Sequence, residues 1–160
     1  MILNVARAYP LDQNMTISSD LLGPLEVEED ELISFPLGLF GFPECQSFIL
    51  VGAEQAGLYW LQSAEHSTLT FLLVDPFVFF QGYAVDISDA DLRELEVAGP
   101  DEVSVLAIVT LPASRSASPT ANLQGPLALN TRTRMAKQIV LEDDDHGTRC
   151  PFALSDAAGT

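Results

Sequence analysis

The chain has 160 residues, most simply one domain, and 48% of them are hydrophobic, which fits a globular protein and excludes a disordered one. Its formal net charge of −16 is uneven: residues 1–102 hold 18 acids against two arginines, whereas residues 103–160 hold five acids and five bases. An acidic surface repels phosphate backbones, so direct nucleic-acid binding is disfavoured. The acidity either keeps the protein soluble or attracts a basic partner, and composition leaves both open.

The sequence predicts a cytoplasmic protein. Its first residues lack a basic stretch followed by a long apolar run, so they do not form a signal peptide. The longest apolar run, residues 71–80, is broken by Asp75 and is too short to span a bilayer. Cys45 and Cys150 are far apart in the sequence, which is more typical of reduced thiols than of a disulfide.

The predicted organisation is a single folded domain over residues 15–152. Residues 1–14 show no periodicity and are expected to form a flexible N-terminal arm, and residues 153–160 are expected to be a disordered tail. Within the domain, short apolar or β-branched runs bounded by turn residues predict strands. The first eight of these runs are residues 15–20, 23–28, 32–35, 47–51, 58–62, 69–74, 83–87 and 102–111.

Residues 35–43 carry Gly38 and Gly41 between two prolines, a pattern that forbids a regular helix or strand. We expect an ordered loop there. No lysine follows the second glycine, so the pattern is not that of a phosphate-binding loop. A hydrophobic corner is favoured over a ligand-binding loop.

One short helix is predicted after Ser88, because Ser88 or Asp89 can cap its first amides while Leu92 and Leu95 share one face. Asp75-Pro76, earlier in the chain, is interpreted as a turn that ends a strand. Residues 77–80 are expected to extend that strand or to turn a corner.

Residues 120–130 are expected to form two strands around a break at Gly125-Pro126, and residues 135–141 a final strand. The amides of Asn122, Gln124 and Asn130 lie among leucines. A buried amide must be hydrogen-bonded, so these side chains are expected to fix the backbone path. The whole pattern predicts an all-β fold: a small antiparallel β-barrel-like domain with about nine or ten short strands and one short helix.

Candidate chemistry is sparse. The turn from Asp143 to His146 lacks the alternating ligands, glycine and distal glutamate of a calcium loop, so a solvated turn is favoured over a metal site. Cys45 has no neighbouring cation to lower its pKa, and Ser63 lacks the flanking glycines of a nucleophile elbow. The sequence therefore predicts no catalytic residue, metal or cofactor.

Five motifs run in order through the domain. They are Ile33-Ser-Phe-Pro-Leu-Gly-Leu-Phe-Gly-Phe42, Leu61-Gln-Ser63, Phe71-Leu-Leu-Val-Asp-Pro-Phe77, Thr120-Ala-Asn-Leu-Gln-Gly-Pro-Leu-Ala-Leu-Asn130 and Lys137-Gln-Ile-Val-Leu141. Together they resemble the family of the flagellar assembly factor FliW, in its order and spacing. Motif residues expected to be structural are Gly38, Gly41, Gln62, Asp75, Pro76, Asn122, Leu123, Pro126, Asn130 and Gln138.

The resemblance implies a non-enzymatic protein that binds flagellin and, alternatively, the RNA-binding translational regulator CsrA. Once flagellin is exported, the freed factor would bind CsrA and relieve repression of flagellin synthesis. The same factor would escort unassembled flagellin in the manner of a chaperone. A monomer is expected, with no contact to membrane or nucleic acid.

Two docking modes stay open. The acidic segments 26–31 and 86–96 could meet basic surface on CsrA. Alternatively, an amphipathic flagellin helix could bind an apolar groove near four phenylalanines, Phe40, Phe42, Phe77 and Phe79. The residues expected to contact partners are Glu26, Glu28, Glu29, Asp30, Glu31, Phe40, Phe42, Phe77, Phe79, Asp86, Asp89 and Asp91. The alternatives are a solvated loop for residues 28–31 and plain core for the phenylalanines.

A rival interpretation is a split β-barrel that binds a small molecule, either a flavin or a phosphate ligand. Such a site needs convergent basic groups. Arg132, Arg134 and Lys137 form the one basic cluster, and they are expected on the solvent side of a hairpin.

Overall fold

The computed structural model describes residues 14–142 and 146–154. The predicted N-terminal arm lies outside these residues except for Asn14, which begins the first strand. The predicted tail likewise lies outside them, apart from the exposed Ala153 and the half-buried Leu154.

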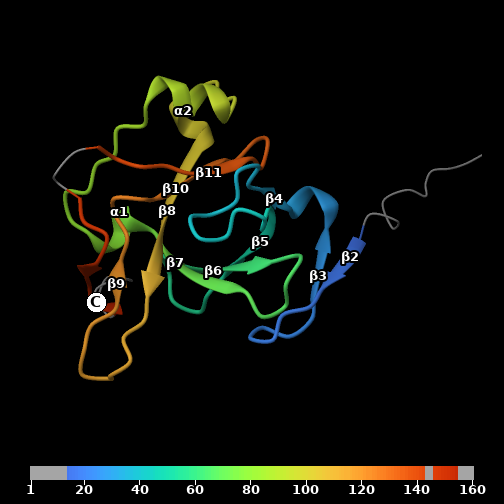
Figure 1. Cartoon of the computed structure of the whole chain (residues 1–160), viewed down its shortest axis with the longest axis horizontal. Helices are drawn as coiled ribbons and strands as arrows, with labels where there is room; N and C mark the ends of the chain where they lie inside the picture. The colour runs from blue at the N-terminus through green and yellow to red at the C-terminus, as the bar shows by residue number, and fades with distance from the viewer. Residues whose placement is uncertain (1–13, 143–145, 155–160) are drawn as a thin grey trace, which may run out of the picture.

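The described residues form short strands joined by loops, with two short helices (Figure 1). The strands are β2 (Asn14–Ile17), β3 (Leu25–Glu28), β4 (Ile33–Ser34), β5 (Ser47–Gly52), β6 (Leu58–Ser63), β7 (Thr70–Val74), β8 (Val103–Thr110), β9 (Thr120–Ala121), β10 (Leu127–Asn130), β11 (Ala136–Gln138) and β12 (Cys150–Pro151). The helices are α1 (Pro76–Phe79) and α2 (Asp89–Glu94), with 3-10 turns η3 (Glu29–Glu31) and η4 (Pro100–Glu102). The prediction of an all-β fold is confirmed.

The main sheet is antiparallel and runs in the order β11-β10-β8-β7-β6-β5-β4, with β9 and β12 added beside the end of β8. A separate hairpin, β2-β3, packs against it through Ile17, Val27 and Ile49. The two ends of the main sheet meet at one isolated bridge between Ser34 and Met135. The sheet therefore curls around its core without closing into a continuous barrel, so the barrel-like prediction holds in a loose sense.

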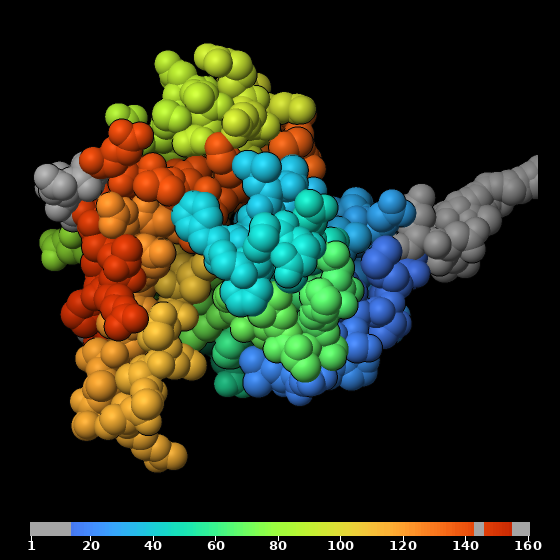
Figure 2. All heavy atoms as spheres, in the orientation of Figure 1, coloured from blue at the N-terminus to red at the C-terminus, as the bar shows by residue number. Residues whose placement is uncertain are grey.

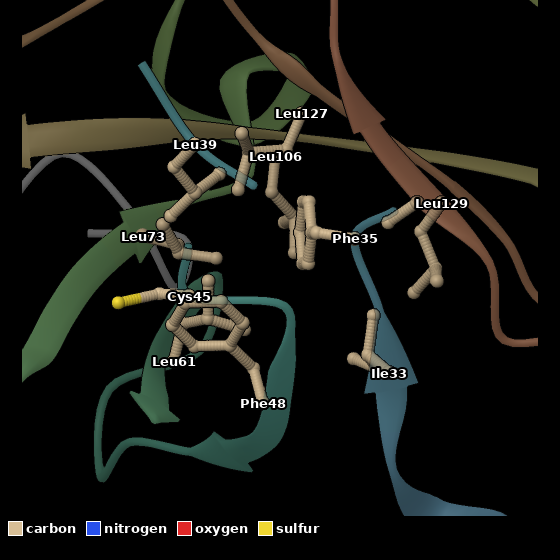
Figure 3. Close-up of a cluster of buried hydrophobic side chains, with 11 residues drawn as sticks. Ile33, Phe35, Leu39, Cys45, Phe48, Leu61, Leu73, Leu106, Leu127 and Leu129 are labelled. Atoms are coloured by element: carbon tan, nitrogen blue, oxygen red, sulfur yellow. The ribbon is translucent and has the colours of Figure 1, made fainter. Parts of the chain in front are cut away.

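The core inside the curled sheet is made by side chains that point inward from its strands. Figure 3 shows Phe35 among side chains from β4, β5 and β10, and Phe35 and Phe48 meet edge to face with ring centroids 5.3 Å apart. The buried members of this cluster are Ile33, Phe35, Leu39, Cys45, Phe48, Leu61, Leu73, Leu106, Leu127, Leu129 and Ala136. Their burial is the main source of stability that the sequence provides.

The segment after β7 differs from the prediction. Residues 77–80 neither extend the strand nor form a simple corner, because Asp75 caps helix α1: its carboxylate accepts a hydrogen bond of 2.9 Å from the Phe77 N–H. Pro76 occupies the first helical turn, where its missing N–H costs nothing. The pair Asp75-Pro76 is thus a helix start as well as a strand end.

The predicted strand at residues 83–87 is wrong. Val85 and Ile87 are half-buried against the cluster that contains Leu95, while Ala84 and Asp86 are exposed. The segment belongs to none of the strand ladders formed by the described residues. The alternation in the sequence reflects one buried side, and the predicted helix beyond it is confirmed, since the Ser88 hydroxyl accepts a hydrogen bond from the Asp91 N–H.

The loop 36–43 is ordered by backbone hydrogen bonds and by two glycines. Gly38 and Gly41 have φ of +69° and +89°, the left-handed region that favours glycine. Leu39 and Phe42 exchange two backbone hydrogen bonds across the loop. This geometry buries Leu39 and leaves Phe40 at the surface.

Gly38→Ala is expected to lower the free energy of unfolding by more than Gly41→Ala does. Both substitutions place Cβ at positive φ, which costs about 1–2 kcal/mol. At Gly38 the new Cβ would also lie 2.5 Å from the Phe42 and Pro43 carbonyl oxygens, whereas the space at Gly41 is open. Urea unfolding followed by Trp60 fluorescence measures both variants, and equal losses would contradict this account.

Candidate functional site

The acidic hairpin, defined here as the exposed carboxylates of β3 and η3, is the first candidate surface. Its members are Glu26, Glu28, Glu29, Asp30 and Glu31. Some also serve local structure: the Thr16 hydroxyl donates to Glu26 at 2.5 Å, and the Glu28 N–H donates to the Glu31 carboxylate at 2.7 Å. None takes part in an ion pair with another described residue, so the hairpin keeps its negative charge.

Helix α2 is tied to β11 by Lys137, whose ammonium group forms ion pairs with Asp91, at 2.5 Å, and with Glu94. Burial tends to raise the pKa of Asp91, but hydrogen bonds from Lys137 and Ser88 hold that pKa below its ordinary value. The hydrogen bonds to Asp91 and Glu94 raise the pKa of Lys137. Asp91 is therefore half-buried and internally paired, while Asp86 and Asp89 are exposed.

The four phenylalanines predicted to line one groove do not lie together. Phe79 is only 7% exposed and packs edge to face on Phe152, so it belongs to the core. Phe40 and Phe42 lie on the loop 36–43, where Phe42 packs on Phe71. Phe77, on α1, is 52% exposed and lies beside the segment that leads to α2. Two separate apolar surfaces replace the single groove.

The first of these surfaces, the loop patch, consists of the exposed side chains of Leu37, Phe40 and Val140. They line a depression of about 320 Å³ together with Asp91 and Lys137. Figure 2 shows the loop in cyan beside the orange segment that contains β11, with α2 above both. The apolar side chains of the loop patch thus lie beside the ion pair of Asp91 with Lys137.

The second surface is the α2 groove, a hollow of about 540 Å³ between α2, α1 and β8. Its uncharged lining residues are Phe77, Val85, Ile87, Leu92, Val97, Ala98, Gly99, Pro100, Val103 and Val105. Asp86 is its one charged lining residue. Sequence reasoning proposed Phe77 and Asp86 for two different docking modes, but the fold places them on the same groove.

Gln138 fixes the position of the loop patch. Its side-chain oxygen accepts a 2.9 Å hydrogen bond from the Phe40 N–H, and its amide nitrogen donates to the Gly125 carbonyl at 2.9 Å. Asn122 holds the same turn, because its side-chain oxygen accepts from the N–H groups of Gln124 and Gly125. The motif at 120–130 therefore anchors the loop at 36–43.

Asn130 anchors α2 in a similar way. Its fully buried amide donates to the carbonyls of Leu95 and Glu96, at 2.8 and 3.2 Å, and its oxygen accepts from the N–H groups of Arg132 and Thr133. Gln62, equally buried, closes a different turn by bonding to Thr70, Ser63 and His66. The sequence indicates that such amides fix a backbone path, but it does not show which surfaces they position.

The basic cluster binds groups of the protein itself. Arg132 pairs with Glu102 at 3.2 Å and donates to the Glu96 carbonyl, and Arg134 donates to the Glu31 carbonyl at 3.1 Å. Lys137 is held by α2. Because these cations are engaged separately, they do not converge on a phosphate site, and the small-molecule interpretation loses its main support.

Residues 14–142 and 146–154 do not meet the requirements of a metal site, a membrane-spanning helix or a disulfide. No group of three or more His, Cys, Asp or Glu side chains within these ranges could hold a metal ion, and Asp143–Asp145 of the candidate cation turn lie outside them. No helix of the described chain is long and apolar enough to cross a bilayer. Cys45 and Cys150 are both free, and burial raises the pKa of Cys45.

Residues 16–152 match the family model described as FliW protein. The chain belongs to the FliW family. It is 39% identical over 139 residues to the flagellar assembly factor FliW of Natranaerobius thermophilus, covering 86% of this chain and 92% of the relative. The FliW of Treponema pallidum is 38% identical over 135 residues, covering 84% and 89%.

A solved structure agrees with this assignment. The crystal structure of a flagellar assembly factor FliW superposes on the chain with a TM-score of 0.79 and 31% sequence identity, covering 86% of this chain and 96% of the other. The resemblance inferred from the five motifs is confirmed. As a member of the FliW family, the chain is a flagellar assembly factor.

Lys137→Met is expected to lower the melting temperature at pH 7, because it leaves Asp91 and Glu94 without their cation. The pKa of Asp91 is depressed on folding, so this stabilisation is present above the unfolded pKa of about 3.9 and is lost as the pH falls through the folded pKa. The difference in melting temperature between wild type and variant should therefore narrow as the pH falls below about 4.

Arg115→Met is the matched control. It removes the same charge from an exposed loop residue that forms no ion pair with the described chain. Circular dichroism melts of the three proteins from pH 7 to pH 3 compare them. The ion pairs do not hold α2 if Lys137→Met lowers the melting temperature no more than Arg115→Met does. The same follows if the decrease for Lys137→Met does not change with pH.

Proposed function

We propose that this FliW-family chain is a cytoplasmic, non-enzymatic factor that binds flagellin and, alternatively, the translational regulator CsrA. Binding CsrA would relieve repression of flagellin synthesis, and binding flagellin would protect the unassembled subunit. Membership of the family supports the setting, and the charges and apolar surfaces support protein partners rather than a small molecule.

The observation that carries the proposal is the unequal pairing of charges. The three ion pairs among described residues all tie α2 or η4 to the turn and strand at 132–137. The acidic hairpin has no such partner. An RNA-binding regulator presents basic surface, which unpaired carboxylates attract while they repel the RNA itself.

Flagellin is assigned to the loop patch. Leu37, Phe40 and Val140 expose apolar area that solvent does not favour, at a position held by Gln138. An amphipathic helix buries one apolar face in such a surface. The two partners are thus proposed to depend on different side chains, one set charged and the other apolar.

Isothermal titration calorimetry with purified flagellin and purified CsrA tests the proposal at two salt concentrations. Asp30→Lys should weaken CsrA binding about five-fold at low salt, since an exposed charge pair contributes up to ~1 kcal/mol. The effect should shrink at high salt. Phe40→Ala should weaken flagellin binding and leave the salt dependence of CsrA binding unchanged.

Two control variants match these changes. Glu54→Lys reverses an exposed charge away from the acidic hairpin, and Leu111→Ala removes an exposed apolar side chain on the β8–β9 connection, which projects from the body in Figure 1. Neither should change binding. If the wild-type chain binds neither partner, the proposed function is wrong; if the controls weaken binding as much as the test variants, the assigned surfaces are wrong.

A further inference from the structure

The α2 groove has an apolar lining with one carboxylate, Asp86, and further acids adjoin its lining residues along the chain. Val103 and Val105 of β8 form one side, Leu92 and Val97 come from α2 and the chain that follows it, and Phe77 is half-exposed within the same lining. Four exposed acids flank the lining segments: Asp86, Asp89, Glu96 and Asp101. None of the four is in an ion pair with another described residue.

The charges near the groove are strongly one-sided. Between residues 83 and 110 the sequence holds seven acids and a single base, Arg93. Three of these acids, Asp91, Glu94 and Glu102, are already paired with Lys137 or Arg132. The remaining four carboxylates give these segments a negative potential that favours a cationic ligand.

The lining also limits the kind of ligand. A bound small molecule needs several placed polar groups, but the lining offers one charged side chain, and that side chain is a carboxylate. Phosphates and other anions would be repelled. A row of aliphatic side chains with one aromatic residue suits the apolar face of a helix, which inserts residues at positions i, i+3, i+4 and i+7.

Fixed contacts hold α2 in place beside the groove. Lys137 ties Asp91 and Glu94 of α2 to β11, and Asn130 binds the carbonyls at the end of the helix. Arg132 binds the Glu96 carbonyl and the Glu102 carboxylate. The segment between these two residues includes Val97 and Gly99, which line the groove. A wall fixed in this way lowers the ordering cost of binding.

We propose that the α2 groove binds a basic amphipathic helix of a protein partner. The apolar face of that helix would pack on Phe77 and the valines, and lysines or arginines on its flanks would face Asp86, Asp89, Glu96 and Asp101. The inference rests on the proposed function in taking the chain to be a protein-binding factor, and it adds a surface separate from the loop patch and the acidic hairpin.

Three fluorescein-labelled peptides of 18 residues would test this groove by fluorescence anisotropy. The first is a leucine–lysine peptide with its leucines on one helical face, the second has the same composition in an order that abolishes that face, and the third replaces lysine by glutamate. The first should bind at least ten-fold more tightly than the other two. Equal binding of the first two peptides would mean simple charge attraction and would overturn the proposal.

Variants locate the binding. Phe77→Ser should weaken the first peptide about ten-fold, whereas Phe40→Ser, which changes an equally exposed phenylalanine on the loop patch, should not. Asp86→Asn with Asp101→Asn should weaken binding at low salt and reduce its salt dependence, while Asp30→Asn should do neither. A melting curve shows whether Phe77→Ser folds. If it does not fold, the double variant Asp86→Asn with Asp101→Asn still tests the groove. Equal effects at test and control positions would overturn the groove as the site.

The same variants separate this inference from the proposed function. If flagellin or CsrA binds the wild-type chain and the peptides do not distinguish the groove, the groove inference is wrong and the function stands. If the wild-type chain binds neither protein partner, the proposed function fails whatever the peptides show. If Phe77→Ser weakens one partner, the groove is assigned to that partner.

Discussion

The buried amide of Asn130 joins the end of β10, the turn before β11 and the end of α2 through four hydrogen bonds. A fully buried amide that lost these bonds would leave backbone groups unsatisfied, at about 1–3 kcal/mol each. The position of α2 therefore depends on a residue that is fully shielded from solvent. Gln138 plays the same part for the loop patch, since it connects the Phe40 N–H to the Gly125 carbonyl. Both candidate apolar surfaces are consequences of buried polar groups.

Several basic residues of this chain form internal contacts, whereas many of its acidic residues form no ion pair with another described residue. The bases at 132–137 bind groups of α2, η3 and η4 and thereby stabilise the fold, whereas most acids of residues 26–31 and 86–101 form no ion pair with another described residue. Surface ion pairs contribute little individually, but Lys137 is largely shielded from solvent and bridges two carboxylates. The excess negative charge is therefore available for association with basic proteins.

The sequence predicted most of the fold because strands and caps have local signals. The runs that became β5, β6, β7 and β8 are rich in apolar residues, and Ser88 with Asp89 marks a helix start. Asp75-Pro76 is compatible with both a strand end and a helix start. The helix is capped by Asp75 and packs through Phe79 on Phe152, a contact with a residue distant in the sequence. The alternation of residues 83–87 signals burial on one side but cannot specify whether a strand lies alongside.

The candidate surfaces were less predictable, because each is assembled from segments that are distant in the sequence. Phe77 and Phe79 are two residues apart, yet one lines the α2 groove and the other is core, since side chains two positions apart on a helix point to different sides. In helix α2, even adjacent residues belong to different surfaces. Asp91 lines the loop patch and Leu92 lines the α2 groove, so one short helix forms a wall of both surfaces. A ligand that displaced α2 at one surface would therefore alter the other, and the ion pairs of Lys137 and the hydrogen bonds of Asn130 oppose such a displacement.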